Sequence, residues 1–147
     1  MLSLSGCGLK VLPAGLGSVL SRQLVTLDLS HNELSAVPAM LPASLLRLHL
    51  DANPIRRLPP ADTLEPPFLH LDSLEELSVS YMPVLEEVEA GAFFGLPRLR
   101  VLSCTDNPAL RSLHSGAFSH LGPSWALTQV FTGIYNPQSA SAVRVHS

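Results

Sequence analysis

Three residues of the types used in hydrolysis occupy equivalent places in the chain. Asp28, His49 and Ser78 each follow a leucine directly, and neighbouring strands ~4.8 Å apart would bring them close together. Serine hydrolases also need a site that excludes water and donors that stabilise the developing oxyanion. An open sheet excludes no water, and no Gly-rich turn follows these residues to supply the donors. We therefore predict no catalytic residues and no enzymatic activity.

Metal binding is the second chemistry that these residue types could support. His49 with Asp28 or Asp51 is the best candidate group, but a flat array of strands does not bring three ligands to within ~2 Å of one ion. The two cysteines, Cys7 and Cys104, lack the spacing of metal ligands. The sequence therefore predicts neither a metal site nor a cofactor.

A repeated pattern of apolar residues must position these side chains. About a fifth of the residues are leucine, whereas aromatic residues make up 5%, which indicates a repetitive core. The best copy of the pattern has the spacing L-x-x-L-x-L-x-x-N-x-L-x-x-V, and five copies begin 21 to 29 residues apart. Their first inward leucines are Leu2, Leu27, Leu48, Leu77 and Leu102.

Each L-x-L pair predicts a short strand whose alternate side chains face inward. We expect strands near residues 2–4, 27–29, 48–50, 77–79 and 102–104. No unit can bury its leucines alone, so the units must stack and share one core. The strands would then form one parallel sheet on the concave side of the stack.

An asparagine closes the turn after most strands, where its amide can satisfy backbone groups that would otherwise be buried without partners. Two units depart from this column, with Cys7 and Met82. Because Met cannot donate a hydrogen bond, we expect the turn at Met82 to be irregular or to use a water molecule. Cys7 and Cys104 would lie roughly 19 Å apart, too far for a disulfide, and we expect both thiols to be buried.

The spacing L-x-x-L-x-L-x-x-N resembles that of the leucine-rich repeat family. The segments at 89–99 and 114–121 also resemble the G-A-F-x-x-L signature of its extracellular members, and imply that Phe93 and Phe118 fill the core on the convex side. The implied fold is an α/β leucine-rich repeat solenoid, curved, with a short parallel concave β-sheet and a mostly irregular or 3-10 convex side.

The resemblance covers residues 1–121, which we interpret as a repeat array of about five units. The unit that begins at Leu48 is the longest, with 29 residues. We expect it to bulge on the convex side, since Pro66 and Pro67 exclude a regular helix there. We interpret residues 122–147 as a non-repeat C-terminal tail with a disordered end, and the solenoid as truncated.

Composition narrows the partners and the location. The net charge of -3 and the pI near 6.0 argue against a nucleic-acid partner. No segment has the ~20 apolar residues needed for direct membrane insertion. The resemblance implies a protein-binding module of a secreted or cell-surface signalling or adhesion protein. An intracellular scaffold or signalling adaptor in the cytoplasm is the alternative, because the chain has no N-x-S/T glycosylation site.

Outward strand positions are the places where side-chain choice is free of core packing. They form a polar, slightly acidic surface with Tyr81 as its aromatic anchor, which would suit a protein ligand or receptor that bears Lys or Arg. The predicted partner-binding residues are Asp28, Arg47, His49, Asp51, Glu76, Ser78, Tyr81, Ser103, Thr105 and Asp106.

Overall fold

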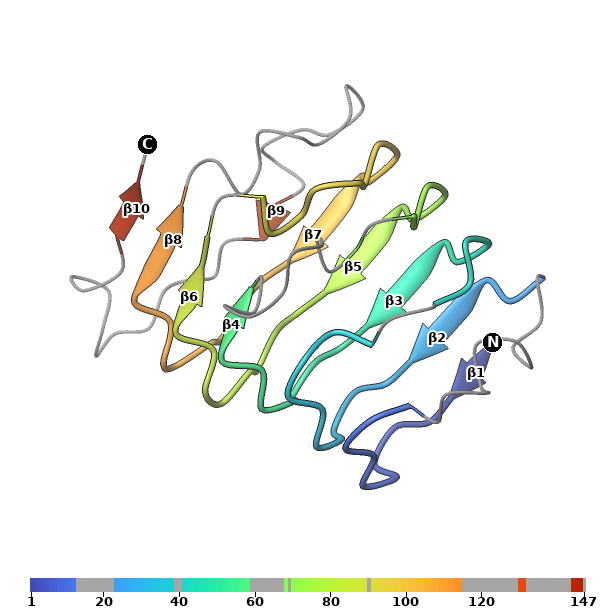
Figure 1. Cartoon of the computed structure of the whole chain (residues 1–147), viewed down its shortest axis with the longest axis horizontal. Helices are drawn as coiled ribbons and strands as arrows, with labels where there is room; N and C mark the ends of the chain where they lie inside the picture. The colour runs from blue at the N-terminus through green and yellow to red at the C-terminus, as the bar shows by residue number, and fades with distance from the viewer. Residues whose placement is uncertain are drawn as a thin grey trace.

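The chain forms a solenoid of parallel strands, seen in a computed structural model (Figure 1). The structure describes residues 1–12, 23–38, 41–58, 68, 70–89, 91–114, 130–131 and 144–146. A six-stranded sheet has the order β1-β2-β3-β5-β7-β9. Its strands are β1 Leu2–Ser3, β2 Thr26–Asp28, β3 Arg47–His49, β5 Glu76–Ser78, β7 Val101–Ser103 and β9 Val130–Phe131.

The leucines of the repeat align across this sheet, as the spacing predicted. Leu2 pairs with Leu27, and Leu27, Leu48, Leu77 and Leu102 follow one another in register. The last four are at most 1% exposed. β2, β3, β5 and β7 each begin and end one residue earlier than we predicted: the second inward residue of each pair, such as Leu29 or Leu50, is buried but already follows the strand.

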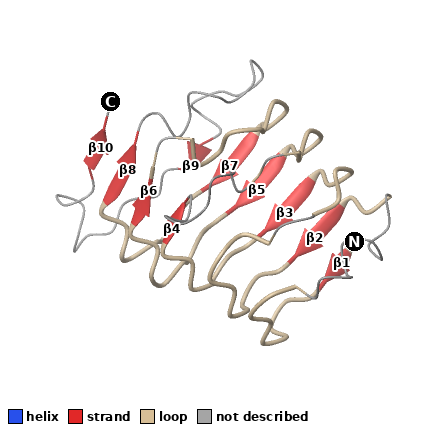
Figure 2. Cartoon of the chain, in the orientation of Figure 1, coloured by secondary structure: helices blue, strands red, loops and turns tan. Residues whose placement is uncertain are grey.

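A second sheet on the other side of the core was not predicted from the sequence (Figure 2). It has the order β10-β8-β6-β4, with β4 Arg57–Leu58, β6 Glu87–Val88, β8 Ser112–His114 and β10 Arg144–His146. The described residues of this side form strands and turns, and none of them is in an α- or 3-10 helix. Of the segment 61–72 in which we predicted the bulge, residues 61–67 and 69 lie outside the described residues, and the domain boundary at 121 stays a prediction.

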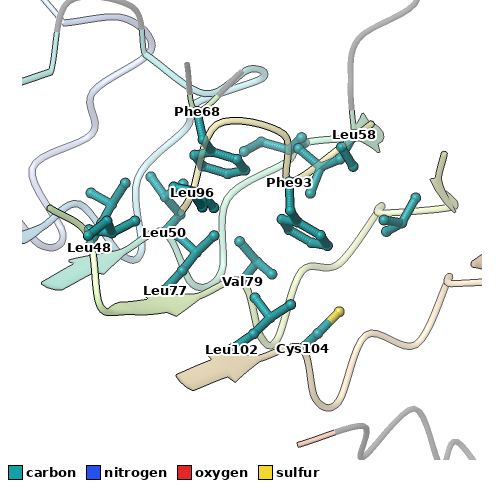
Figure 3. Packing of buried hydrophobic residues seen from close by; sticks show 14 of the residues in the cluster. Leu48, Leu50, Leu58, Phe68, Leu77, Val79, Phe93, Leu96, Leu102 and Cys104 are labelled. Atoms are coloured by element: carbon teal, nitrogen blue, oxygen red, sulfur yellow. The ribbon is translucent and has the colours of Figure 1, made fainter. Parts of the chain in front are cut away.

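The core between the sheets is built from leucines and one aromatic pair. Phe68 and Phe93 are fully buried and stack with ring centroids 6.0 Å apart (Figure 3). Burial of Phe93 confirms part of the prediction, but its stacking partner comes from the long unit, and Phe118 lies outside the described residues. Each fully buried leucine or phenylalanine contributes about 1.5–3 kcal/mol relative to an exposed one.

Asparagines connect the turns of successive units, as predicted. Asn53 Nδ2 donates to Leu50 O of its own unit at 2.9 Å and to Leu29 O of the preceding unit at 3.0 Å. Its Oδ1 accepts from Leu34 N at 3.1 Å. Asn32 makes the same kind of contacts with the first unit. The amides of Asn32 and Asn53 therefore each satisfy backbone groups of two units at once.

The irregular turn expected at Met82 is wrong. Tyr81 has a φ of 54°, as His31, Ala52 and Asp106 have between 54° and 57° at the equivalent positions, and Met82 N donates to Asn107 Oδ1 at 2.8 Å. An asparagine at 82 would have accepted from Ile55 N. That group instead donates to Asn53 O at 2.9 Å, across a three-residue turn centred on Pro54, whose ring fixes φ.

The two thiols lie in different environments. Cys104 is 3% exposed, as predicted, whereas Cys7 is exposed, and both are free. The expectation for Cys7 is wrong: it follows β1, the first strand in the order of the sheet, in a turn where Gly6 and Gly8 both have a φ of 68°. Its backbone N–H still donates to Asn32 Oδ1 at 3.0 Å.

Candidate functional site

Outward side chains of the six-stranded sheet form a central column in register. Asp28 pairs with His49, His49 with Ser78, and Ser78 with Ser103. All four are partly exposed, because each alternates with a buried leucine along its strand. The structure thus brings together the central column that we predicted for partner binding.

The hydrogen bonds of this column do not have the pattern of a catalytic triad. Ser78 Oγ donates to Asp51 Oδ1 at 2.6 Å, so its proton is directed to a carboxylate of the flanking column. Asp28 Oδ1 accepts from Ser30 N at 2.9 Å. Neither bond involves His49, whose role in a triad would be to accept from the serine and donate to the aspartate.

The two flanking columns are held by contacts between neighbouring units. At the beginning of the strands, Arg47 Nε lies 3.2 Å from Glu76 Oε2. At their end, Asp51 Oδ1 also accepts from Ser80 N at 2.8 Å, and Ser80 Oγ accepts from Thr105 N at 3.0 Å. These contacts orient the side chains of Arg47, Glu76 and Asp51, which are predicted residues, and that of Ser80 between Asp51 and Thr105.

The most exposed predicted residues stand where the chain leaves the sheet. Tyr81 is 60% exposed, and Asp106 is exposed at the equivalent position of the next unit. The turns are aligned, since His31 N donates to Asp51 O at 2.8 Å and Tyr81 N donates to Thr105 O at 3.0 Å. This alignment forms a continuous row of side chains along one edge of the sheet.

Comparisons with known proteins agree with this repeated geometry. Residues 23–43 match the family model of the Leucine Rich Repeat. The chain is 34% identical over 108 residues to Tsukushi of Gallus gallus, a match that covers 74% of this chain and 28% of Tsukushi.

The chain contains the leucine-rich repeat. It is also similar to two proteins of Mus musculus. Podocan-like protein 1 is 40% identical over 85 residues, which cover 58% of this chain and 14% of the relative, and Podocan is 35% identical over 113 residues, which cover 74% and 17%. The chain spans less than a third of the length of these relatives. They are secreted-type leucine-rich repeat proteins, which confirms the resemblance to extracellular members and indicates a protein-binding module.

The second sheet of this leucine-rich repeat array carries a network of ion pairs that we did not predict. Arg57 Nη2 lies 2.6 Å from both Glu87 Oε2 and Glu89 Oε1. The hydrogen bond to Glu89 and the charges of Glu89 and Glu87 raise the pKa of the Arg57 guanidinium above its ordinary value. Arg56 and Arg111, from the units on either side, both approach Glu86 Oε2, at 3.6 and 3.7 Å.

A signal for this network is present in the sequence. Arg57, Glu87 and Ser112 follow their inward leucines by nine or ten residues, so the repeat places them in one row. Opposite charges at equivalent positions of consecutive units predict ion pairs between those units. We did not predict these ion pairs because we expected a mostly irregular convex side. Side chains of irregular segments do not align from one unit to the next.

The array also has a shallow hollow of about 210 Å³ at the beginning of the strands. It is lined by Arg47, Glu75, Glu76, Arg100 and Val101. Its charges already pair with one another, since Arg100 Nη1 lies 3.7 Å from Glu75 Oε1 and Arg47 pairs with Glu76. Within the described residues, no three side chains of His, Cys, Asp or Glu gather in a way that could hold a metal ion.

Proposed function

We propose that this chain is the protein-binding part of a secreted or cell-surface signalling or adhesion protein. A protein ligand or receptor would bind the outward side chains of the six-stranded sheet and of the turns that follow its strands. The proposed contact residues are the predicted ones, from Asp28 and Arg47 on β2 and β3 to Ser103, Thr105 and Asp106 at β7. The leucine-rich repeat and the secreted-type relatives support a binding module.

The observation that carries the proposal is the register of the outward columns. Asp28, His49, Ser78 and Ser103 are consecutive partners across four strands, and the hydrogen bonds of Asp51 and Ser80 fix the next column. A surface whose side chains are already held in place loses little conformational entropy when a partner binds. The same side chains contribute no apolar area to the core, so they can be changed without loss of the fold.

A pair of matched substitutions tests this surface. Ser103→Arg places a long side chain on the outward face of β7 in the six-stranded sheet, and Ser112→Arg makes the same change on β8 of the second sheet. Each tagged chain would be crosslinked to intact cells, and the captured proteins identified by mass spectrometry. We expect proteins that are retained by Ser112→Arg and lost by Ser103→Arg. Equal recovery with both variants would contradict the proposal.

Location is tested separately. The relatives support an extracellular location, and none of the described residues forms a helix that is long and apolar enough to cross a membrane. Expression of the complete open reading frame with an epitope tag should place the product in the medium or on the cell surface. Retention of the product in the cytosol would favour the intracellular scaffold instead.

A further inference from the structure

The turns after the strands form a surface that differs in chemistry from the sheet itself. We define the turn edge as residues 30–34, 51–55, 80–84 and 105–109. Backbone bonds align its four turns: His31 N donates to Asp51 O, Ala52 N to Ser80 O, and Tyr81 N to Thr105 O, at 2.8 to 3.0 Å. Side chains at equivalent positions of these turns therefore lie next to one another along the edge.

Charge on the turn edge has one sign. It contains the carboxylates of Glu33, Asp51 and Asp106 and contains no Lys or Arg. The described arginines that form ion pairs lie elsewhere, among them Arg47 and Arg100 at the beginning of the strands and Arg57 on the second sheet. The negative charge of the turn edge thus has no positive neighbour within the same surface.

Apolar exposure on the turn edge is concentrated in the unit of Met82. Tyr81 is 60% exposed, Val84 is 37% exposed, and Pro83 between them is also exposed. Tyr81 has a φ of 54°, a region that is uncommon for bulky residues and costs them about 1–2 kcal/mol. The same φ recurs at His31, Ala52 and Asp106 of the equivalent turns, so the turn is a regular feature of the repeat, and in the unit of Met82 it holds a large ring exposed to solvent.

We infer that the turn edge binds a segment of a protein partner in which a Lys or Arg side chain lies next to an apolar one. The apolar side chain would pack against Tyr81 and Val84, where an aromatic anchor contributes most to binding. The basic side chain would pair with Asp106 or lie over the ring of Tyr81. This inference rests on the proposed function, which it narrows from the whole outward surface to one edge and one kind of partner.

Peptide binding to the full chain tests the inference. Three synthetic peptides of equal length would be titrated by calorimetry: one that alternates Arg with Leu, one that alternates Glu with Leu, and one that alternates Ser with Leu. We expect binding of the Arg–Leu peptide alone at physiological salt. Tyr81→Ser should weaken it about tenfold, as loss of an interface anchor does, and Asp106→Asn should weaken it by a smaller factor that disappears at high salt.

Two control variants remove the same groups elsewhere. Asp72→Asn removes an exposed carboxylate outside the turn edge, and Val25→Ser removes an apolar side chain that is 39% exposed. Both should bind the Arg–Leu peptide as the unchanged chain does. Equal weakening by Asp72→Asn and Asp106→Asn would show general attraction to a negative protein and would overturn the inference, as would binding of the Ser–Leu peptide or no binding of any peptide.

The outcomes separate this inference from the proposed function. If Ser103→Arg abolishes partner capture while Tyr81→Ser changes neither capture nor peptide binding, the outward surface binds a partner but the turn edge does not. If neither variant changes capture, both proposals fail. Far-UV circular dichroism of each variant should match that of the unchanged chain, since none of Tyr81, Asp106 and Ser103 belongs to the buried apolar core.

Discussion

The two sheets share one core, yet their outward faces have opposite chemistry. On the six-stranded sheet, the central column consists of short polar side chains such as Ser78 and Ser103, and Asp51 is oriented by hydrogen bonds to hydroxyl and backbone groups. On the second sheet, long arginine and glutamate side chains pair across units. Ion pairs between units are therefore the main contacts of the second outward face, whereas on the six-stranded sheet they occur at the beginning of the strands, as between Arg47 and Glu76, and leave the central column to the contacts with a partner that we propose.

The two outward faces are separated by a buried apolar core, and the substitution with the largest expected effect disrupts that core. Leu50→Asp buries an unpaired charge at a position with 0% exposure, which should cost about 4 kcal/mol or more and unfold the array. Urea denaturation monitored by circular dichroism measures this. His49→Asp adds the same charge one residue away, on the outward face, and should leave a cooperative transition; unfolding by both variants would mean that the outward face is not solvated.

The asparagine column should be the next most sensitive feature. Asn53→Ala removes the amide that serves Leu29 O, Leu50 O and Leu34 N, and leaves these buried groups without partners. We expect a loss of about 2–3 kcal/mol in the free energy of unfolding. Met82→Leu changes the same column without removing a side-chain hydrogen bond and should cost less than about 1.5 kcal/mol. Similar losses for the two variants would contradict the role of the amide.

Burial of Cys104 makes the inward face sensitive to alkaline pH. Burial raises the pKa of this thiol to about 12, although its hydrogen bond with Asn107 lowers it. The unfolded thiol ionises near 9, so the contribution to stability is complete below pH 9 and is lost as the pH rises towards 12, by roughly 1 kcal/mol per pH unit. Unfolding free energies from pH 8 to 10.5 should fall less steeply for Cys104→Val. Parallel slopes would show that the thiol is hydrated in the folded chain.

The ion pairs of the second sheet should have a smaller effect that depends on salt. Arg57→Gln removes the partner of Glu87 and Glu89, so stability should fall by less than for Asn53→Ala, because partly exposed pairs are screened by solvent. Thermal unfolding at low and at high salt tests this. The difference from the unchanged chain should shrink at high salt; a difference that salt does not alter would assign the loss to packing of the arginine stem.

The smallest effect concerns Tyr81. Tyr81→Gly relieves the positive φ, and we expect a change in unfolding free energy of less than about 1 kcal/mol, because relief of strain and the entropy of glycine oppose each other. Thermal unfolding and peptide titration of Tyr81→Gly together separate a role of Tyr81 in packing from a role in contacting a partner. A large loss of stability would make Tyr81 a packing residue and not a contact residue.

Much of the fold could be predicted because its cause is local. The spacing of Leu27, Leu48, Leu77 and Leu102 fixes which side chains must be buried, and stacking then fixes the parallel register. The turn at Met82 could not be predicted from that residue alone. Its regular geometry depends on Asn107 in the next unit and on Pro54 in the preceding one, and the sequence does not show that the two compensate.

Part of the candidate surface could likewise be predicted from the sequence, and part could not. Alternation along a strand determined that Asp28, His49 and Ser78 face outward and share a column, since the side-chain period of a strand is two residues. Only the tertiary structure decided how these groups are used: Ser78 donates to Asp51 and not to His49, and Arg57 pairs with two glutamates of the next unit. Periodicity sets the direction of a side chain, whereas its partner depends on distances between units that sequence spacing does not contain.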